Sequence, residues 1–395
     1  RLRAREDDQK LAREGIAHAR GQLQQVLGPD GELAQPAHHE VGDVVGVVLR
    51  PHTRRILVDR YGAHPGAITV LRPGVDRPRQ EIALVLNPIK ARADEVRRAL
   101  EAMADREGLG SVLVLETEED DPGTQMAKDA LEAGVRLVIA AGGDGTVRTV
   151  AEQLTGTDVA LGVVPLGTGN LLARNLDLPI NDIEECLRIA LTGRQRRIDT
   201  VDVRFTHEEG EVTRQTFTVI GGAGYDADIM RDTKDELKDV AGWLAYSEAG
   251  MRHLRGKRHD VSISLDGGAS RRFKVRTVMV ANCGMLTGGV ELLPEAKLDD
   301  GLLDVLVLSP RHALDWARIA AKTVTRHGAK IPVMHTEQAQ RVKVEFADPM
   351  PSQLDGDATG HIVALDARVQ PDSLIVMLVA EDDASVRDDG VSAAA

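Results

Sequence analysis

Short apolar runs alternate with amphipathic helical segments between residues 82 and 192, and this alternation constrains the fold more than any other feature. The apolar runs lie at residues 82–86, 111–115, 135–141 and 159–164 and have the composition of strands buried on both faces of a sheet. The helical segments lie at residues 91–106, 123–134, 146–154 and 183–192. Such alternation predicts an open parallel α/β sheet with right-handed crossovers.

Beyond residue 198 the pattern changes to strands that alternate apolar and polar residues or are rich in β-branched residues. We expect these strands at residues 199–205, 212–220, 260–265, 272–281, 303–308, 341–346, 361–365 and 373–379. Two helices are expected among them, near residues 232–254 and 312–327. The predicted fold class is therefore α/β with two domains, in which an antiparallel β-rich sandwich follows the parallel α/β sheet.

Four parts are predicted along the chain: an extension of unknown role at 1–80, the α/β domain at 81–198, the β-rich domain at 199–380, and a disordered acidic tail at 381–395. The formal net charge of -13 argues against a protein that coats nucleic acid or anionic membrane through bulk charge. Two cysteines without CxxC spacing argue against a disulfide framework or structural zinc, and fit a reducing compartment. Since the sequence begins with Arg1, an upstream membrane anchor is left open.

Three glycines surround one aspartate directly after the predicted strand at 135–141. This turn consists of Gly142, Gly143, Asp144, Gly145 and Thr146. Such a turn lets backbone N–H groups approach an anion, and the N-terminus of the following helix favours negative charge. Ligands of open α/β sheets bind at such strand ends. An ordinary strand-to-helix turn with Asp144 as a local cap explains the same residues.

A second glycine-rich turn at 165–170 follows the next predicted strand and contains Gly167, Thr168, Gly169 and Asn170. Turns on consecutive parallel strands are expected side by side, where together they would hold a polyphosphate. Neither turn is a Walker A loop, because no Gly-Lys-Ser/Thr follows. Phosphate charge must then be met by backbone amides, Thr hydroxyls, Mg²⁺ and either Lys90 or Arg174.

The two turns, at this separation, resemble the catalytic domain of the diacylglycerol kinase family, which includes bacterial soluble lipid kinases and eukaryotic diacylglycerol, sphingosine and ceramide kinases. Residues 167–176 look most like the bacterial soluble branch. Further matches are Asn87-Pro88 and residues 222–227, 294–304 and 355–357. The resemblance covers residues 81–380 and implies a first domain like that of NAD kinases and phosphofructokinases, which binds nucleotide. It also implies a second domain that binds lipid and contributes to catalysis.

The resemblance implies an ATP-dependent, Mg-assisted lipid kinase that phosphorylates a lipid hydroxyl, most simply diacylglycerol to phosphatidate. It implies that Asp355 is the general base, acting as the O–P bond forms because an alcohol is too weak an acid to ionise beforehand. It implies that Asp144 is a second catalytic residue, bridging metal and nucleotide. Asp357 stands where the family usually has Glu. Without the other motifs, Asp355-Gly356-Asp357 would be interpreted as a hairpin turn.

The resemblance also implies binding residues. The implied nucleotide contacts all lie after predicted strands and are Asn87, Pro88, Lys90, Thr117, Gly142, Gly143, Gly145, Thr146, Gly167, Thr168, Gly169 and Asn170. Mg²⁺ would be held by Asp300 and by the carbonyls of Lys297 and Leu302, which supply hard oxygen ligands; a solvated acidic turn is the alternative. The chain departs from the family at Leu171, where many members have Asp, and at residues 89–91, where a Ser-Gly pair usually touches phosphate.

The expected partner is a lipid substrate at a membrane surface, with no nucleic acid, and a homodimer is left open. The expected location is cytoplasmic, peripheral at the inner face of the membrane. Residues 240–246 include Trp243 and Tyr246 and precede a basic flank, as in peripheral membrane contacts. An amphipathic helix packed on the sheet has the same pattern. The helix expected at 312–327 is a weaker candidate.

Three alternatives stay open. The first is a kinase of the same fold for a sphingoid base or another lipid alcohol. The second is a soluble-metabolite kinase, since NAD kinases and phosphofructokinases share the Gly-Gly-Asp-Gly turn. The third is a nucleotide-binding regulatory protein without catalysis. A Rossmann dinucleotide site at residues 222–224 is disfavoured, because the acidic residue expected about 20 positions on, after a second parallel strand, is missing.

Overall fold

The computed structural model describes residues 81–224, 258–286, 291–312, 314–316, 318–319 and 331–380. All of them belong to the unit Arg77–Ala395. The predicted extension at 1–80, the helix expected near 232–254 with its membrane candidate, and the tail at 381–395 lie outside the described residues. Of the helix expected at 312–327, residues 312, 314–316 and 318–319 are described, and all of these except 312 are helical.

A four-stranded parallel sheet forms the first lobe, as the apolar runs predict. Its strands are β1 (Ile82–Leu86), β2 (Leu113–Glu116), β3 (Leu137–Gly142) and β4 (Ala160–Pro165). They lie in the order β2-β1-β3-β4, and every neighbouring pair is parallel. Strands β1 and β4 are buried along their whole length. Burial on both faces accounts for their continuous apolar sequence.

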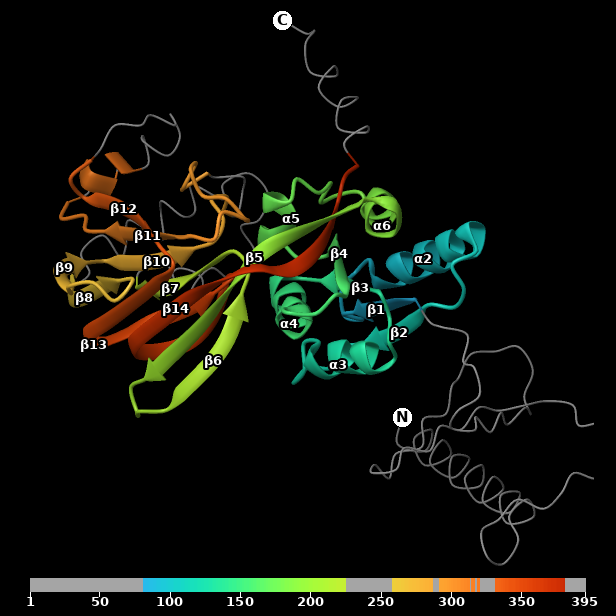
Figure 1. The fold of residues 1–395 in the computed structure, drawn as a ribbon, viewed down its shortest axis with the longest axis horizontal. Coiled ribbons are helices and arrows are strands. Elements are labelled where there is room, and N and C mark those ends of the chain that lie inside the picture. The colour runs from blue at the N-terminus through green and yellow to red at the C-terminus, as the bar shows by residue number, and fades with distance from the viewer. Residues whose placement is uncertain are drawn as a thin grey trace, which may run out of the picture. The chain divides into compact units, whose positions relative to one another are not determined.

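Helices cover both faces of this sheet (Figure 1). They are α2 (Ala93–Glu107), α3 (Thr124–Glu132), α4 (Asp144–Leu154), α5 (Leu171–Asn175) and α6 (Ile183–Thr192). Helices α3 and α4 pack together, as do α2 and α6. Asp182 caps α6 by accepting a hydrogen bond from the Glu185 N–H at 3.0 Å. The predicted helices of this lobe are thus confirmed, with shifts of up to two residues at their ends.

The second lobe is antiparallel and β-rich, which confirms the predicted fold class. Its strands are β5 (Arg194–His207), β6 (Val212–Phe217), β7 (Ile220–Gly224), β8 (His259–Leu265), β9 (Arg271–Val275), β10 (Thr277–Ala281), β11 (Leu303–Leu308), β12 (Met334–Ala339), β13 (Arg341–Leu354) and β14 (Asp357–Leu378). They follow the order β12-β11-β10-β7-β13-β14, with β5 on β14 and β8 on β13. Phe205, Phe217 and Leu354 lie in its separate core.

Strand β14 joins the two lobes into one sheet. The C-terminal end of β14 pairs in parallel with β4, with Ile375 opposite Ala160 and Val376 opposite Leu161. It also pairs with β5 from Ile362 to Leu378, and both strands run from one lobe into the other (Figure 1). The strands predicted at 361–365 and 373–379 are therefore one strand, interrupted by an irregularity between Gln370 and Leu374. The start of β14 is consequently tied to the parallel sheet through continuous backbone pairing.

Two further strand predictions need correction, and one strand was missed. Residues 212–220 form β6 and β7 rather than one strand, because the N–H groups of Thr218 and Val219 bond to the Asp355 carboxylate instead of to a neighbouring strand. Residues 272–281 divide at Arg276 into β9 and β10. Strand β12 was not predicted, because the four residues between its buried ends are exposed and mostly polar.

Gly222 on β7 tests the packing of this sheet. A Cβ there would overlap the Val278 carbonyl oxygen and lie 2.9 Å from Met279 Cα, both in the backbone of β10. We expect Gly222→Ala to lower the free energy of unfolding by about 3 kcal/mol, because the strand backbones would have to separate. In Gly267→Ala, where φ is +72° and a Cβ would meet no atom within 4 Å, the expected loss is about 1 kcal/mol. Urea unfolding measures both, and equal losses would contradict this packing.

Candidate active site at the edge of the parallel sheet

The two glycine-rich turns lie against each other at the carboxyl ends of β3 and β4. Gly142 is paired with Pro165, and the Leu166 N–H donates to the Gly142 carbonyl at 2.8 Å. A Cβ on Gly167 would lie 2.8 Å from Gly143 Cα. The turns therefore meet backbone to backbone, and side chains are excluded between them.

The Asp144 side chain connects the two turns. It starts helix α4, and its two carboxylate oxygens accept from the backbone N–H groups of Asn170 at 2.9 Å and Leu171 at 2.5 Å. Burial raises the pKa of Asp144, the two amide donors oppose that shift, and the negative charges of Asp355 and Asp357 add to it. The Asn170 side chain closes the second turn through hydrogen bonds to the N–H (3.0 Å) and carbonyl (2.9 Å) of Gly167. Asp144 thus fixes the shape of the second turn.

Other predicted nucleotide contacts lie at the same edge. Asn87 follows β1 and Thr117 follows β2, where their N–H groups donate to Ala141 and Leu86 at 2.9 Å each. Pro88 lies next to Asn87. The Lys90 Nζ lies 3.9 Å from the position that a Cβ on Gly143 would occupy. A cation therefore lies beside the first turn, in the segment where the chain departs from the family pattern.

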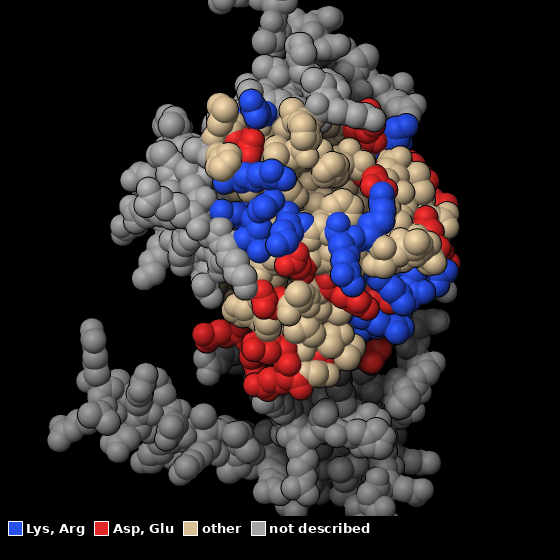
Figure 2. All heavy atoms as spheres, turned by 90° about the vertical axis from the view of Figure 1, so that its left-hand side faces the viewer, with Lys and Arg blue, Asp and Glu red and all other residues tan. Residues whose placement is uncertain are grey.

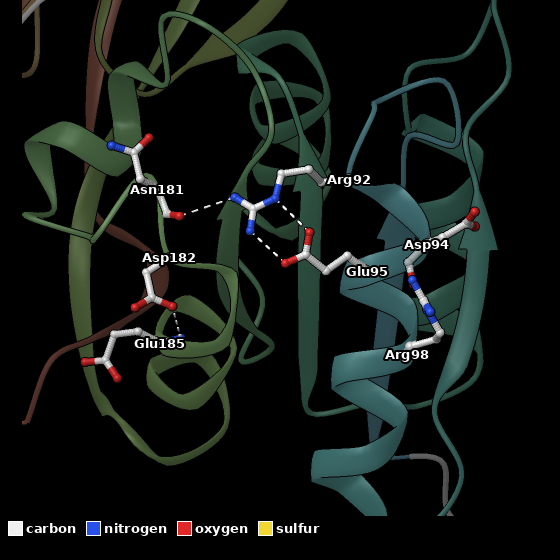
Figure 3. Close-up of polar contacts among 7 residues, drawn as sticks. All are labelled: Arg92, Asp94, Glu95, Arg98, Asn181, Asp182 and Glu185. Carbon is white, nitrogen blue, oxygen red and sulfur yellow. Dashed lines mark hydrogen bonds and ion pairs between the residues drawn. The ribbon is translucent and has the colours of Figure 1, made fainter.

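Arg92 fastens the loop that contains Lys90. Its guanidinium donates to both Glu95 carboxylate oxygens, at 2.7 and 2.8 Å, and to the Asn181 carbonyl at 3.2 Å. Figure 3 shows Arg92 between Glu95 on α2 and the segment that precedes α6. In the second turn, Arg174 Nε similarly donates to the Gly169 carbonyl at 2.8 Å. Thr168 lies between Gly167 and Gly169 in that same turn.

Asp355 lies in the second lobe and is only 2% exposed. Its Oδ2 accepts from the N–H (2.9 Å) and hydroxyl (3.1 Å) of Thr218, and its Oδ1 accepts from the N–H groups of Val219 (3.0 Å) and Ile220 (2.8 Å). Burial raises the pKa of Asp355, and these donors together with Arg148 oppose the shift. Because a carboxylate has about four lone-pair sites, the four donors occupy its accepting capacity.

Asp357, two residues on, faces the first lobe. A Cβ on Gly145 would lie 2.8 Å from Asp357 Oδ2, so this carboxylate lies against the first turn of α4. Arg148 Nη2 lies 3.2 Å from the same oxygen, and 46% of the Asp357 side chain is exposed. The turn between β13 and β14 therefore has one carboxylate buried in its own lobe and one that faces the other lobe. The structure brings Asp357, Asp144 and the glycine-rich turns together.

The predicted metal segment lies around a different aspartate, Asp199. The Asp199 carboxylate accepts from the N–H groups of Gly301 at 2.7 Å and Asp372 at 2.9 Å. Burial raises the pKa of Asp199, the two amide donors oppose that shift, and the charges of Asp372 and Asp300 add to it. Asp300 is exposed and accepts from the Leu302 N–H at 3.0 Å. Within the described ranges, no three His, Cys, Asp or Glu side chains are arranged to hold a metal. The carboxylate of Asp300 and the carbonyls of Lys297 and Leu302 are still hard oxygen donors, which suit Mg²⁺.

Arg148, Thr218 and Asp199 were missed by sequence reasoning. A signal for Arg148 existed, since it follows Asp144 by four residues, a spacing that places both on one face of a helix. The role of Thr218 had no local signal, because it depends on Asp355, which is 137 residues distant.

Known proteins resemble both lobes. Residues 81–203 match the family model described as diacylglycerol kinase catalytic domain, and residues 219–378 match the YegS C-terminal NAD kinase beta sandwich-like domain. A Bacillus subtilis protein named diacylglycerol kinase is 33% identical over 60% of this chain and 77% of its own length. A Chromohalobacter salexigens protein named "Probable lipid kinase YegS-like" is 31% identical over 70% of this chain and 87% of its own length.

A solved structure shows the same fold. It is a diacylglycerol kinase from Bacillus anthracis, and the comparison covers 77% of this chain and 98% of that one at 19% identity, with a TM-score of 0.53.

Asp355→Asn tests whether Asp355 anchors its turn. The substitution replaces one of the two accepting oxygens with an NH₂ group. This group cannot accept the hydrogen bonds that reach that position, so we expect a loss of about 2–3 kcal/mol in the free energy of unfolding. For Asp357→Asn, where the side chain is half-exposed and the amide oxygen can still accept from Arg148, we expect a smaller loss of about 1 kcal/mol. Urea unfolding at neutral pH compares them. An Asp355→Asn variant as stable as the wild type would show that the four donors do not need a carboxylate.

Proposed function

This chain belongs to the diacylglycerol kinase family, and on that premise we propose that it transfers the γ-phosphoryl group of ATP to a lipid hydroxyl, with diacylglycerol as acceptor and phosphatidate as product. Kinases of such a family use ATP, typically with a divalent metal. The observation that carries the proposal is the position of Asp357, a half-exposed carboxylate of the second lobe against the helix that begins at the first glycine-rich turn.

The glycine-rich turns support binding of a polyphosphate. A helix N-terminus and closely packed turns present backbone N–H groups to an anion. The N-terminus of α4 follows Gly143, and Lys90 Nζ lies beside that residue. Phosphoryl transfer needs little covalent chemistry from the protein, which must position the reactants and neutralise charge on the transferred group. In this proposal the backbone amides and Lys90 position the phosphates and neutralise their charge.

The general base is assigned to Asp357 rather than to Asp355. The resemblance implied Asp355, but its carboxylate accepts four hydrogen bonds, and a base needs a free lone pair to receive the proton of the acceptor hydroxyl. Asp357 is half-exposed and faces the nucleotide turns. In the proposed step, the lipid oxygen attacks the γ-phosphorus, its proton passes to Asp357, and ADP leaves. Asp355 holds the turn that positions this base.

Mg²⁺ bound to Asp300 and to the carbonyls of Lys297 and Leu302 would supply positive charge. The Asp300 carboxylate accepts a hydrogen bond from the Leu302 N–H within its own turn. The Gly301 N–H bond to Asp199, at 2.7 Å, holds the same turn.

A lipid acceptor requires contact with a membrane surface. No helix in the described part of the chain is long and apolar enough to cross a bilayer. Figure 2 shows groups of basic side chains across the middle of the end of the second lobe, with acidic side chains between and below them. Two of the ion pairs of this lobe are Arg271 with Glu337 and Lys274 with Asp260. The carboxylate beside each of these two cations weakens its attraction for anionic lipid.

Incubation with γ-labelled ATP and a mixture of total lipid extract, NAD and a sugar phosphate tests both the activity and the identity of the base. We expect labelled phosphatidate from the wild type and a kcat lower by about 10²–10⁴-fold for Asp357→Asn, with little change in KM for ATP. Asp260→Asn, an exposed carboxylate on β8, is the matched control and keeps full activity.

Three results of this assay would revise the proposal. Label in NAD or a sugar phosphate and none in lipid would overturn the lipid kinase. A labelled sphingoid phosphate in place of phosphatidate would overturn the choice of acceptor. Full activity in Asp357→Asn would overturn the assignment of Asp357 as the general base.

Lys90→Met tests the nucleotide site. Removal of the cation beside Gly143 is expected to raise KM for ATP about tenfold or more, because a charged partner of phosphate is lost. Lys128→Met, an exposed lysine on α3, is the control and leaves KM for ATP unchanged. Steady-state kinetics over a range of ATP concentrations measures the effect. An unchanged KM in Lys90→Met would remove Lys90 from the site.

A further inference from the structure

Arg148 links the two lobes beside the proposed base. It lies on α4, and its side chain is only 12% exposed. Nη2 lies 3.2 Å from Asp357 Oδ2, and Nη1 donates to the Gln215 Oε1 on β6 at 3.2 Å. Both partners belong to the second lobe. One guanidinium of the first lobe therefore holds a strand and a turn of the second.

The surroundings of Arg148 favour a charged partner. Its positive charge opposes the rise that burial causes in the pKa of Glu152, four residues further along α4, and it does the same for Asp355. The combined negative charge of Glu152, Asp355 and Asp357 therefore stabilises the guanidinium at this position. Because the pair with Asp357 is largely removed from water on the arginine side, it should be stronger than the surface pairs of the second lobe.

Two constraints together define where the Asp357 carboxylate lies. The Asp355 hydrogen bonds fix the backbone of the turn, but they leave the Asp357 side chain free to rotate towards solvent. Arg148 supplies the second constraint, since it contacts the same oxygen that lies against Gly145. Aspartate at this position is one methylene shorter than the glutamate usual in the family, so it has less reach to correct a misplaced carboxylate.

We propose that Arg148 is a positioning residue, which holds the Asp357 carboxylate over the first turn of α4 so that it faces the acceptor hydroxyl. This inference rests on the proposed function, in which Asp357 is the base. Arg148 acts through Asp357 and not on the nucleotide. Its loss should therefore lower kcat and leave KM for ATP in place, because a displacement of about 1 Å in a catalytic group costs about 10²-fold in rate.

Kinetics of Arg148→Met and Arg148→Lys, with diacylglycerol vesicles and ATP, test this role. We expect kcat to fall about 30–100-fold in Arg148→Met, with KM for ATP within about twofold of the wild type. Arg148→Lys keeps the positive charge but loses the planar guanidinium. Its kcat should be about tenfold higher than that of Arg148→Met. Arg98→Met is the matched control, because Arg98 is exposed on α2 and, among the described residues, hydrogen-bonds only within its own helix, to the Asp94 carbonyl. This variant keeps wild-type kinetics.

A double-mutant cycle separates positioning from a general structural effect. In the Asp357→Asn background, Arg148→Met should cost less than about threefold in kcat, because the carboxylate that it positions is gone. An undiminished effect in that background would overturn the inference, as would a raised KM for ATP with unchanged kcat, which would place Arg148 on the phosphates. If Arg148→Met does not fold, the effect of Arg148→Lys on kcat is compared instead in the wild type and in Asp357→Asn.

The two proposals fail in different ways. If Asp357→Asn retains wild-type activity, the base assignment is wrong, and the role of Arg148 falls with it. If Asp357→Asn is inactive while Arg148→Met retains wild-type kcat, the proposed function stands and only the role of Arg148 is wrong.

Discussion

A buried carboxylate with four donors organises the second lobe. The hydrogen bonds from Thr218, Val219 and Ile220 to Asp355 interrupt the strand pattern between β6 and β7, and they fix the turn from which β14 begins. A buried charge costs several kcal/mol unless it is hydrogen-bonded, so the donors and the acceptor depend on each other. The bond from the Asp355 N–H to the Ile220 carbonyl, at 2.8 Å, adds a backbone link between the same segments.

This anchor matters for function because of the strand that follows it. Strand β14 runs from the Asp355 turn to its pairing with β4, whose carboxyl end leads into the second glycine-rich turn. The glycine-rich turns and the proposed base are therefore joined through one continuous sheet rather than through a flexible linker. Asp144 connects the two turns with each other, and Arg148 connects their helix with Asp357. Both links involve carboxylates, which makes the site sensitive to loss of single charges.

Much of the first lobe could be predicted from the sequence, because continuous apolar runs and helical periodicity are local signals. The meeting of Gly143 and Gly167 followed from the same reasoning, since neighbouring parallel strands end at one edge. Strand β12 could not be predicted from an exposed, polar sequence, and the division at Thr218 depends on a carboxylate far along the chain. The pair of Arg148 and Asp357, separated by 209 residues, had no local signal that joined its partners. Nothing local to Asp355-Gly356-Asp357 indicates that the first carboxylate is buried among hydrogen-bond donors and that the second is half-exposed.

Amide hydrogen exchange of Thr218, Val219 and Ile220 tests the anchor most directly. If these N–H groups are bonded to a buried carboxylate, they should exchange as slowly as the amides in the middle of β7 and β10, through unfolding of the whole lobe. The exposed turn at residues 208–211, between β5 and β6, supplies the fast reference within the same lobe. Exchange of the three amides at the rate of that turn would contradict the anchor, and with it the fixed position of Asp357.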